Sequence, residues 1–353
     1  MSHHSRRGIL ARGAGTTTSY YLAVAHNNSP NVSVYPWNDT TGFGAKFSNP
    51  ATLPAGTYGV GVAFTPDGGA LAVSSGSSPY LQVYPWSTSG FGTKYSDPAT
   101  LPAGSPNRCT FSNAGDAVIV VHQVSPYVSA YPWSSSGFGA KYADPVVLPA
   151  GGNSLGVDFS PSDNAVAIGS NSLPYVQVYA WTSALGFGTK YANPASAMNS
   201  SSLQPKFSPS GAYLASANVS SPRINVYNWT SLSGFGSKIA NPSTLPTGQA
   251  NGVAFSPSGS AIAVAHATTP FVSAYPWTTG FGTKFANPAS LPPGTGQDVA
   301  FSPTGSSITV ASATTPYIVA YAWSSSGFGA KFSNPGTLPT GSGFAVAFGK
   351  IVS

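Results

Sequence analysis

The sequence predicts an all-β fold, a seven-bladed β-propeller of four-stranded blades. The first observation is a repeat, because tryptophans recur every 46 to 49 residues along the 353-residue chain. They are Trp37, Trp86, Trp133, Trp181, Trp229, Trp277 and Trp323. The second observation is composition, since 40 Gly, 32 Pro and no Glu make the chain poor in helix formers and rich in turn formers. A period in this range is typical of propellers, in which each blade contributes four short strands.

One complete unit, residues 251–294, shows the expected strands in order. "GVAF" at 252–255 ends at the turn-forming "SPSG", and "AIAVAHA" follows at 261–267. "FVSAYPW" at 271–277 is the third strand, and a glycine-rich "TTGFG" breaks it. A weaker fourth strand is predicted at 283–291, "TKFANPASL". The first two strands are apolar at nearly every position, which indicates sheets buried on both faces between neighbouring blades.

The two ends of the repeat region predict how the ring closes. "YYLAVA" at 20–25 begins at the second strand of a unit, and "GFAVAF" at 343–348 supplies a first strand with nothing after it. We therefore expect the first blade to be completed by the C-terminal strand. The domain prediction is a basic arm at 1–19 followed by the propeller at 20–353.

Two family resemblances rest on the repeat. "FSPSGSAIAVAHATTPFVSAYPW" at 255–277 resembles the core of WD-repeat and YVTN-type propellers, and the likeness extends over residues 20–348. The repeat has no Gly-His before its first strand and no Trp-Asp after its third, so the WD hydrogen-bonded tetrad does not carry over. The tail "YPWxxxxGFGxKxxNPxxLPxG" resembles propeller repeats of tailed-phage structural proteins, which implies a virion component.

Charge and cysteine content exclude several function classes. The net charge is +6 with a pI near 9.3, but only 6% of residues are charged and no basic run exceeds Arg6–Arg7. Nucleic-acid binding is therefore not expected. Cys109 is the single cysteine, so neither an intramolecular disulfide nor a cysteine zinc cluster is expected. The chain shows no signal peptide or membrane-spanning run, and we expect it to be made in the cytoplasm and to reside in a virion.

Catalytic motifs are not found. The eight acidic residues are all aspartates, several lie in turns, and the chain has no nucleophile elbow, P-loop or H-E-x-x-H motif. From this we expect a protein that is not an enzyme and that uses no metal or cofactor.

Four charged residues interrupt the small-residue pattern of the first strands: Arg108, Asp158, Lys206 and Asp298. The first strand of a blade is the innermost, so these residues are candidate binding residues in the central channel. Two interpretations stay open. Asp158 and Lys206 form an inter-blade ion pair while Arg108 and Asp298 are solvated, or the four bind a polar ligand or ion at the channel mouth.

Three histidines, His26, His122 and His266, end the second strands of their blades. They are either turn formers or a contact surface on the rim. The blades that carry them lie too far apart in the ring for a shared metal ion.

A lysine lies at the start of the predicted fourth strand of each blade: Lys46, Lys94, Lys141, Lys190, Lys238, Lys284 and Lys331. We expect these lysines to be structural, each stem covering an aromatic ring while the ammonium reaches carbonyls of the Gly-Phe-Gly turn. The alternative is a cationic ring that binds acidic glycans.

The sequence as a whole favours a non-catalytic structural or interaction module of a virion. Its expected partners are other structural proteins of a larger assembly, with residues 1–19 docking on them. The alternatives are a lectin-like binder of host-surface glycans, with aromatics near "YPW" holding sugar rings, and a cytoplasmic interaction hub.

Overall fold

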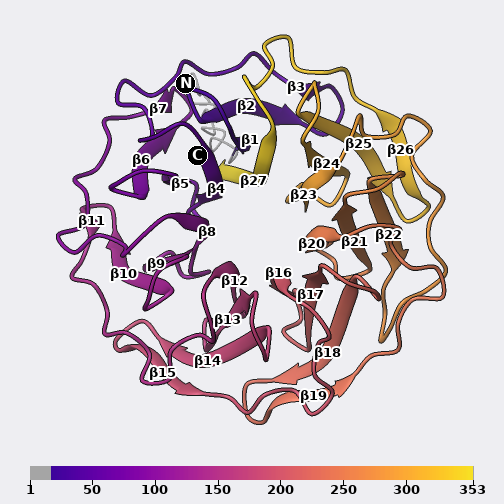
Figure 1. Cartoon of the computed structure of the whole chain (residues 1–353). Helices are drawn as coiled ribbons and strands as arrows, with labels where there is room; N and C mark the ends of the chain where they lie inside the picture. Colours follow the sequence, from indigo (N-terminus) through magenta and orange to yellow (C-terminus); the bar gives the residue numbers. More distant parts are fainter. Residues whose placement is uncertain (1–16, 353) are drawn as a thin grey trace, which may run out of the picture.

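The computed structural model describes residues 17–352 and, over that range, contains 27 strands and no helix. The strands form seven antiparallel sheets arranged as blades of a ring (Figure 1). Six blades have four strands, and in the sixth blade a single bridge from Trp277 to Phe281 replaces the fourth strand. The predicted seven-bladed β-propeller is confirmed. No described segment is a helix that could cross a membrane.

Blades are numbered by the order of their tryptophans. The inner strands of blades 1 to 7 are β27 (Gly343–Val352), β4 (Gly59–Phe64), β8 (Pro106–Phe111), β12 (Ser154–Phe159), β16 (Ser202–Phe207), β20 (Ala250–Phe255) and β23 (Gly296–Phe301). The second strands are β1 (Thr18–His26), β5 (Ala70–Ser75), β9 (Ala117–His122), β13 (Ala165–Ser170), β17 (Tyr213–Asn218), β21 (Ala261–His266) and β24 (Ser307–Ser312). The third strands are β2 (Val32–Asn38), β6 (Leu81–Ser87), β10 (Val128–Ser134), β14 (Val176–Thr182), β18 (Ile224–Thr230), β22 (Val272–Pro276) and β25 (Ile318–Ser324). The outer strands are β3 (Gly42–Phe43), β7 (Gly90–Phe91), β11 (Gly137–Phe138), β15 (Gly186–Lys190), β19 (Gly234–Lys238) and β26 (Gly327–Lys331).

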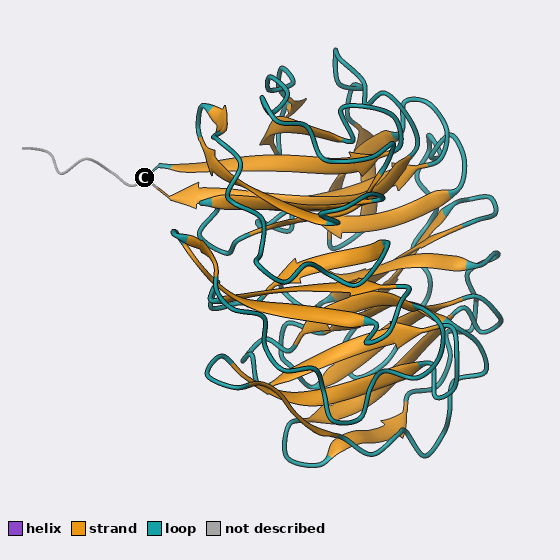
Figure 2. Ribbon diagram, turned by 60° about the vertical axis from the view of Figure 1, so that its left-hand side comes forward, coloured by secondary structure: helices purple, strands orange, loops and turns teal. Residues whose placement is uncertain are grey.

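Blade 1 is built from both ends of the chain, as predicted. β27 pairs antiparallel with β1, from Thr18 opposite Val352 to His26 opposite Gly343. The two strands are 9 and 10 residues long, whereas β4 and β5 have 6 each. Figure 2 shows the C-terminal end of this ribbon extending beyond the neighbouring strands. The predicted arm lies outside the described residues except for 17–19, and Thr18 already belongs to β1.

The fourth strand lies earlier in the repeat than predicted. The structure forms it from the Gly-Phe segment that we expected to be a break, so that Gly42 pairs with Asn38 and Phe43 with Trp37. Gly42 has a φ of 81°, which a residue with a side chain adopts with strain. The ring of Phe43 packs edge-on against Trp37 at 5.1 Å. This contact holds in place a strand of only two residues.

Each tryptophan joins its own blade to the preceding one. Trp86 is 4% exposed, and its ring lies edge-on to Phe91 of the same blade at 4.9 Å. On its other side it meets Phe47, the residue after Lys46 in blade 1, at 5.0 Å. Such edge-to-face pairs are a favoured aromatic geometry. The tryptophans therefore belong to the packing between blades.

Blade 5 lacks the aromatic after its lysine, and Ile239 takes that position. A tyrosine on the second strand of the same blade compensates. The ring of Tyr213 lies edge-on to Trp277 of blade 6 at 5.1 Å. The aromatic contact between the two blades is thus preserved by a residue from a different strand.

Gly68 should be intolerant of a side chain because of the C-terminal ribbon. A Cβ on Gly68 would lie 2.0 Å from the carbonyl oxygen of Lys350, and the φ of Gly68 is +75°. Gly259 is the matched control, since it has a φ of +71° and the atom nearest to an added Cβ would be Pro209 Cδ at 4.0 Å. We expect Gly259→Ala to lower the free energy of unfolding by about 1 kcal/mol and Gly68→Ala by about 2 kcal/mol. Urea unfolding followed by tryptophan fluorescence measures the free energy of unfolding of both variants. Equal losses would contradict the close contact between Gly68 and Lys350 of β27.

Candidate functional site

The inner strands enclose a chamber of about 350 Å³ at the centre of the ring. Arg108, Gln204, Lys206 and Asp298 line it together with small and apolar residues. An adjoining pocket of about 360 Å³ lies at the mouth where the inner strands end, and Asp158 and Lys206 line it. All four charged residues that interrupt the sequence repeat are therefore brought together at one place.

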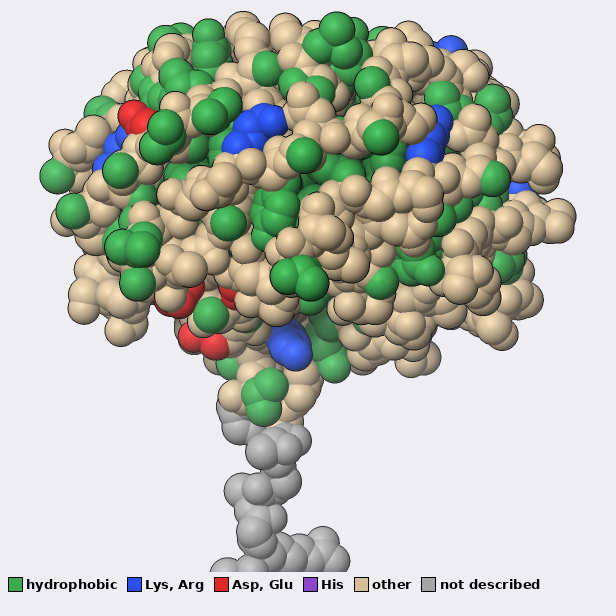
Figure 3. Space-filling model, turned by 90° about the horizontal axis from the view of Figure 1, so that it is seen from below, with side chains coloured by type: hydrophobic (Ala, Val, Ile, Leu, Met, Phe, Trp, Pro, Cys, Tyr) green, Lys and Arg blue, Asp and Glu red, His purple; other side chains and the backbone are tan. Residues whose placement is uncertain are grey.

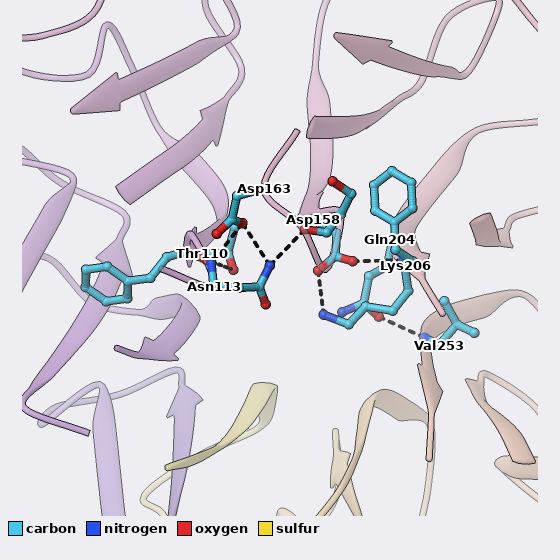
Figure 4. A network of polar contacts seen from close by, with 10 residues as sticks. Thr110, Asn113, Asp158, Asp163, Gln204, Lys206 and Val253 are labelled. Carbon is cyan, nitrogen blue, oxygen red and sulfur yellow. Dashed lines mark hydrogen bonds and ion pairs between the residues drawn. The ribbon is translucent and has the colours of Figure 1, made fainter. Parts of the chain in front are cut away.

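Asp158 and Lys206 form the ion pair that the repeat position predicts. Lys206 Nζ donates to Asp158 Oδ1 at 2.6 Å, and Asp158 Oδ2 accepts from the backbone N–H of Phe207 at 2.8 Å (Figure 4). The Asp158 side chain is 8% exposed, whereas that of Lys206 is 41% exposed because it extends into the open chamber. Lys206 therefore keeps N–H donors available to a ligand.

Burial and charge act on this pair in opposite directions. Burial raises the pKa of Asp158 above its usual range, and the neighbouring Lys206 only partly offsets that effect. Burial lowers the pKa of Lys206, but the charge and hydrogen bond of Asp158, with the charge of Asp298, outweigh it and raise that pKa. Lys206 is thus a stable cation at neutral pH, and Asp158 is a more basic carboxylate than an exposed one.

Arg108 and Asp298 pair with each other across the ring instead of being separately solvated. Arg108 comes from blade 3 and Asp298 from blade 7, and Arg108 Nη1 donates to Asp298 Oδ2 at 2.9 Å. Their side chains are 16% and 4% exposed. Asp298 also accepts from the backbone N–H groups of Val299 and Val346 at 2.9 and 3.1 Å. Both of its oxygens therefore have protein donors.

Three channel side chains share one structural task. Asp158, Gln204 and Asp298 each accept the backbone N–H of a residue on the next inner strand. Asp158 accepts from Phe207 at 2.8 Å, Gln204 accepts from Val253 at 2.8 Å, and Asp298 accepts from Val346 at 3.1 Å. An inner strand is the edge of its sheet, so its outward N–H groups have no ladder partner and are costly to leave unpaired. The sequence marked Asp158 and Asp298 as unusual but gave no sign of this role.

A second polar network lies at the same mouth between blades 3 and 4. Asp163 accepts from the backbone N–H and the side-chain amide of Asn113 at 2.9 and 2.8 Å, and from the backbone N–H of Ala114 at 2.7 Å (Figure 4). Asp163 has a φ of 50° at a turn position where other blades carry glycine. An aspartate replaces the usual glycine at this turn because its carboxylate bonds blade 4 to blade 3.

Cys109 lies in the wall of the chamber as a free, buried thiol. Burial raises its pKa to about 12. Because the thiolate is the reactive form, this cysteine is unreactive at neutral pH.

The three histidines lie inside the blades and not on an exposed rim. Each is fully buried, with Nε2 at 3.0 to 3.1 Å from a serine hydroxyl on the third strand. The pairs are His26–Ser33, His122–Ser129 and His266–Ser273. In blade 2 the corresponding bond runs from Ser75 to Gln82 at 2.8 Å. Direct contact between these imidazoles and a partner would require the blades to open, and their predicted binding role stays a prediction.

The repeated lysines bond locally, but not to the predicted partners. Lys46 Nζ donates to the carbonyl of Phe47 at 3.3 Å and to Asn49 Oδ1, not to the Gly-Phe-Gly turn. The side-chain partner is the Asn, or in blades 2 and 3 the Asp, of the Asn-Pro step. Bonds of this kind are made by Lys46, Lys94, Lys141, Lys190, Lys284 and Lys331. Figure 3 shows cationic side chains as separate spots on the wall of the ring. The structural role of these lysines stays a prediction.

Metal-ion sites and exposed aromatic platforms are not found among residues 17–352. No group of three or more His, Cys or Asp side chains there is placed to hold a metal ion. The tyrosines of the "YPW" motifs are fully buried and the tryptophans are at most 9% exposed. The aromatics that the lectin hypothesis assigned to sugar stacking are therefore used in packing.

Comparison with known proteins gives similarity in fold. No family model matches the sequence, and no curated protein matches it. The periplasmic gluconolactonase of Pseudomonas aeruginosa superposes with a TM-score of 0.70 at 16% identity, over 94% of this chain and 99% of that one. A Bacteroides fragilis protein assigned provisionally as a 6-phosphogluconolactonase gives 0.72 at 12% identity, over 94% and 98%. A Lactobacillus plantarum protein gives 0.70 at 16%, over 94% and 99%.

These neighbours overturn the functional expectation drawn from the sequence. The prediction of a non-catalytic virion module that is not an enzyme is wrong, because several of the neighbours that carry a functional name are lactonases. The resemblances to WD-repeat proteins and to phage structural proteins gain no support beyond the propeller fold. That prediction relied on the scarcity of acidic residues, whereas the fold gathers Asp158 and Asp298 into the channel.

Proposed function

We propose that the protein is a hydrolase that opens a small anionic sugar lactone in the central channel. The observation that carries the proposal is that Arg108 and Lys206 line one chamber with unused hydrogen-bond donors. Among residues 17–352, Arg108 uses one of its five N–H donors, on Asp298, and Lys206 one of its three, on Asp158.

The unused hydrogen-bonding capacity of the chamber favours an acceptor-rich ligand. Each oxygen of Asp158 and Asp298 already has a protein donor, whereas the two cations keep free N–H groups. Phosphate and carboxylate groups bind well to such donors, and Arg matches their geometry. The lactonase names of the structural neighbours support the reaction class.

The proposed chemistry assigns a role to each of three side chains. A water oxygen attacks the lactone carbonyl carbon, and the ring C–O bond breaks to give a carboxylic acid and an alcohol. Lys206 donates a hydrogen bond to the oxygen on which negative charge develops. Asp158, whose pKa burial raises, takes the proton from the water and returns it to the departing ring oxygen. Arg108 holds the anionic group of the substrate.

The test is hydrolysis of 6-phosphogluconolactone and of gluconolactone, followed as proton release above the spontaneous rate at pH 7. We expect kcat/KM to fall about 100-fold in Lys206→Ala, because one stabilising donor is lost. Alanine is the repeat residue at this position, as in Ala63 and Ala254, so the backbone should accept it. Arg108→Ala should reduce the preference for the phosphorylated substrate.

Two further variants make the outcome decisive. Asp158→Ala/Lys206→Ala removes both charges together and so leaves no unpaired buried ion. Lys46→Ala removes a lysine on the outer wall and should leave kcat/KM unchanged. Hydrolysis equal to the spontaneous rate in the unaltered protein, or full activity in the double variant, would refute the proposal.

A further inference from the structure

The opposite mouth of the channel, where the inner strands begin, contains a separate pocket of about 260 Å³. Its lining includes the second residue of every inner strand, together with Gln249 and Arg108. The pocket is smaller than the clefts of roughly 300–1,000 Å³ that hold drug-sized ligands. A ligand of the size of a single six-membered ring suits it.

Carboxamides form the polar part of this mouth, and two of them are oriented by the next blade. Asn107 Nδ2 donates to the carbonyl of Ser154 at 2.6 Å, and Asn251 Nδ2 donates to that of Gly296 at 2.8 Å. These bonds commit the amide nitrogens to the protein. Asn107 Oδ1 accepts no hydrogen bond from the described residues, so an acceptor remains at the mouth.

Gln249 and Gln297 add more unused hydrogen-bonding groups. Gln249 Nε2 donates to Asn251 Oδ1 at 2.9 Å, while its Oε1 has no donor among residues 17–352. Over the same residues the side chain of Gln297 makes no hydrogen bond, although Gln297 is half-buried. The mouth therefore presents both free acceptors and free donors. A hydroxyl group satisfies both kinds at once, because it donates and accepts.

Two apolar walls flank the carboxamides. Val60 and Phe344 come from adjacent blades 2 and 1, and Leu155 and Leu203 come from adjacent blades 4 and 5. Around the ring, blade 3 with Asn107 separates the two apolar walls on one side. Blades 6 and 7, which carry Asn251 and Gln297, separate them on the other side. A ligand with apolar faces and polar edges would complement this alternation.

Charge sets the ligand class. Arg108 is the single charged residue that lines the pocket, and it forms an ion pair with Asp298, which lines the chamber. A cation would meet no carboxylate in this lining, and an anion would meet Arg108 alone, whose charge Asp298 already offsets, without the Lys206 that lines the chamber. The favoured ligand is therefore uncharged.

We propose that this mouth is a second binding site, for an uncharged, hydroxyl-bearing ring of monosaccharide size. Apart from Arg108, which lines both, the residues of this pocket do not line the chamber of the proposed hydrolase, and no reaction is required. It does not depend on the hydrolase proposal, since binding is measured directly.

The test is titration of the isotopically labelled protein with D-glucose and D-galactose, followed by the side-chain amide NMR signals of Asn107, Asn251 and Gln297. We expect saturable shifts of these signals at millimolar sugar. Gln297→Leu should weaken binding at least about tenfold. Leucine already occupies the corresponding position as Leu155 and Leu203, and no side-chain hydrogen bond is lost, so the melting temperature should not change.

Thr110→Ala is the control, because Thr110 lines the chamber and the far mouth and alanine is the repeat residue there. Its sugar affinity should match that of the unaltered protein. D-Glucuronate and adenosine are the comparison ligands. The proposal is overturned by the absence of saturable shifts with either neutral sugar, by tighter binding of glucuronate or adenosine, or by unchanged affinity in Gln297→Leu.

Discussion

Replacing Trp86 with alanine is expected to lower the free energy of unfolding by about 4 kcal/mol. The ring is 4% exposed and packs edge-on against Phe91 and Phe64 of its own blade and Phe47 of blade 1. Its removal leaves a cavity between two blades and cancels several aromatic pairs at once. Equilibrium unfolding in urea, followed by far-ultraviolet circular dichroism, measures the loss.

The control for this substitution is Leu232→Ala, which shortens a side chain that is 95% exposed. We expect it to change the free energy of unfolding by less than about 0.5 kcal/mol. A loss below about 1 kcal/mol in Trp86→Ala would mean that the inter-blade contacts do not determine stability. An unfolding transition that splits into two steps would instead locate the damage at the junction of blades 1 and 2.

Acidification from pH 7 to pH 5 is expected to destabilise the fold through its buried histidines. Burial lowers the pKa of His266 from 6.5 to about 4, and it also lowers the pKa values of His26 and His122. The unfolded chain takes up protons below pH 6.5 while the folded chain does not, so stability is complete above pH 6.5 and falls as the pH drops. For His266 the full loss, reached near pH 4, is about 3 kcal/mol. Urea midpoints measured across this pH range report the slope.

His266→Ser provides the matched variant. Serine ends the second strand in three other blades, as Ser75, Ser170 and Ser312, so the fold accepts it there. In this variant the free energy of unfolding should fall less between pH 6.5 and 4, because the contribution of His266 is removed. An unchanged slope would show that His266 takes up its proton in the folded state.

The number of blades and the closure of the ring were predictable because both depend on sequence period alone. The recurrence of tryptophan gave the count, and the strand at 343–348 without a following second strand gave the partner of residues 20–25. The fourth strand was misplaced because glycine-rich segments usually end strands. In β3 the contact of Phe43 with Trp37, which no local pattern contains, holds the Gly-Phe pair as a strand.

The candidate site was predictable in membership but not in geometry. Asp158 and Lys206 occupy the same repeat position in consecutive blades. Consecutive blades are neighbours in the ring, so their contact could be predicted. Arg108 and Asp298 lie 190 residues apart in blades that are not neighbours, so their pairing depends on the width of the channel. The backbone N–H groups that Asp158 and Asp298 accept are present in every inner strand and leave no mark in the sequence.

The pairing of β1 with β27 has a consequence for synthesis on the ribosome. Thr18 meets Val352, so the innermost strand of blade 1 is the last part of the propeller to be translated. Until then β1 exposes an unpaired edge, and blades 2 to 7 can fold in turn as an open arc. The ring can close only after β27 has been translated, so a chain that stops before residue 343 would keep the edge of β1 open to aggregation.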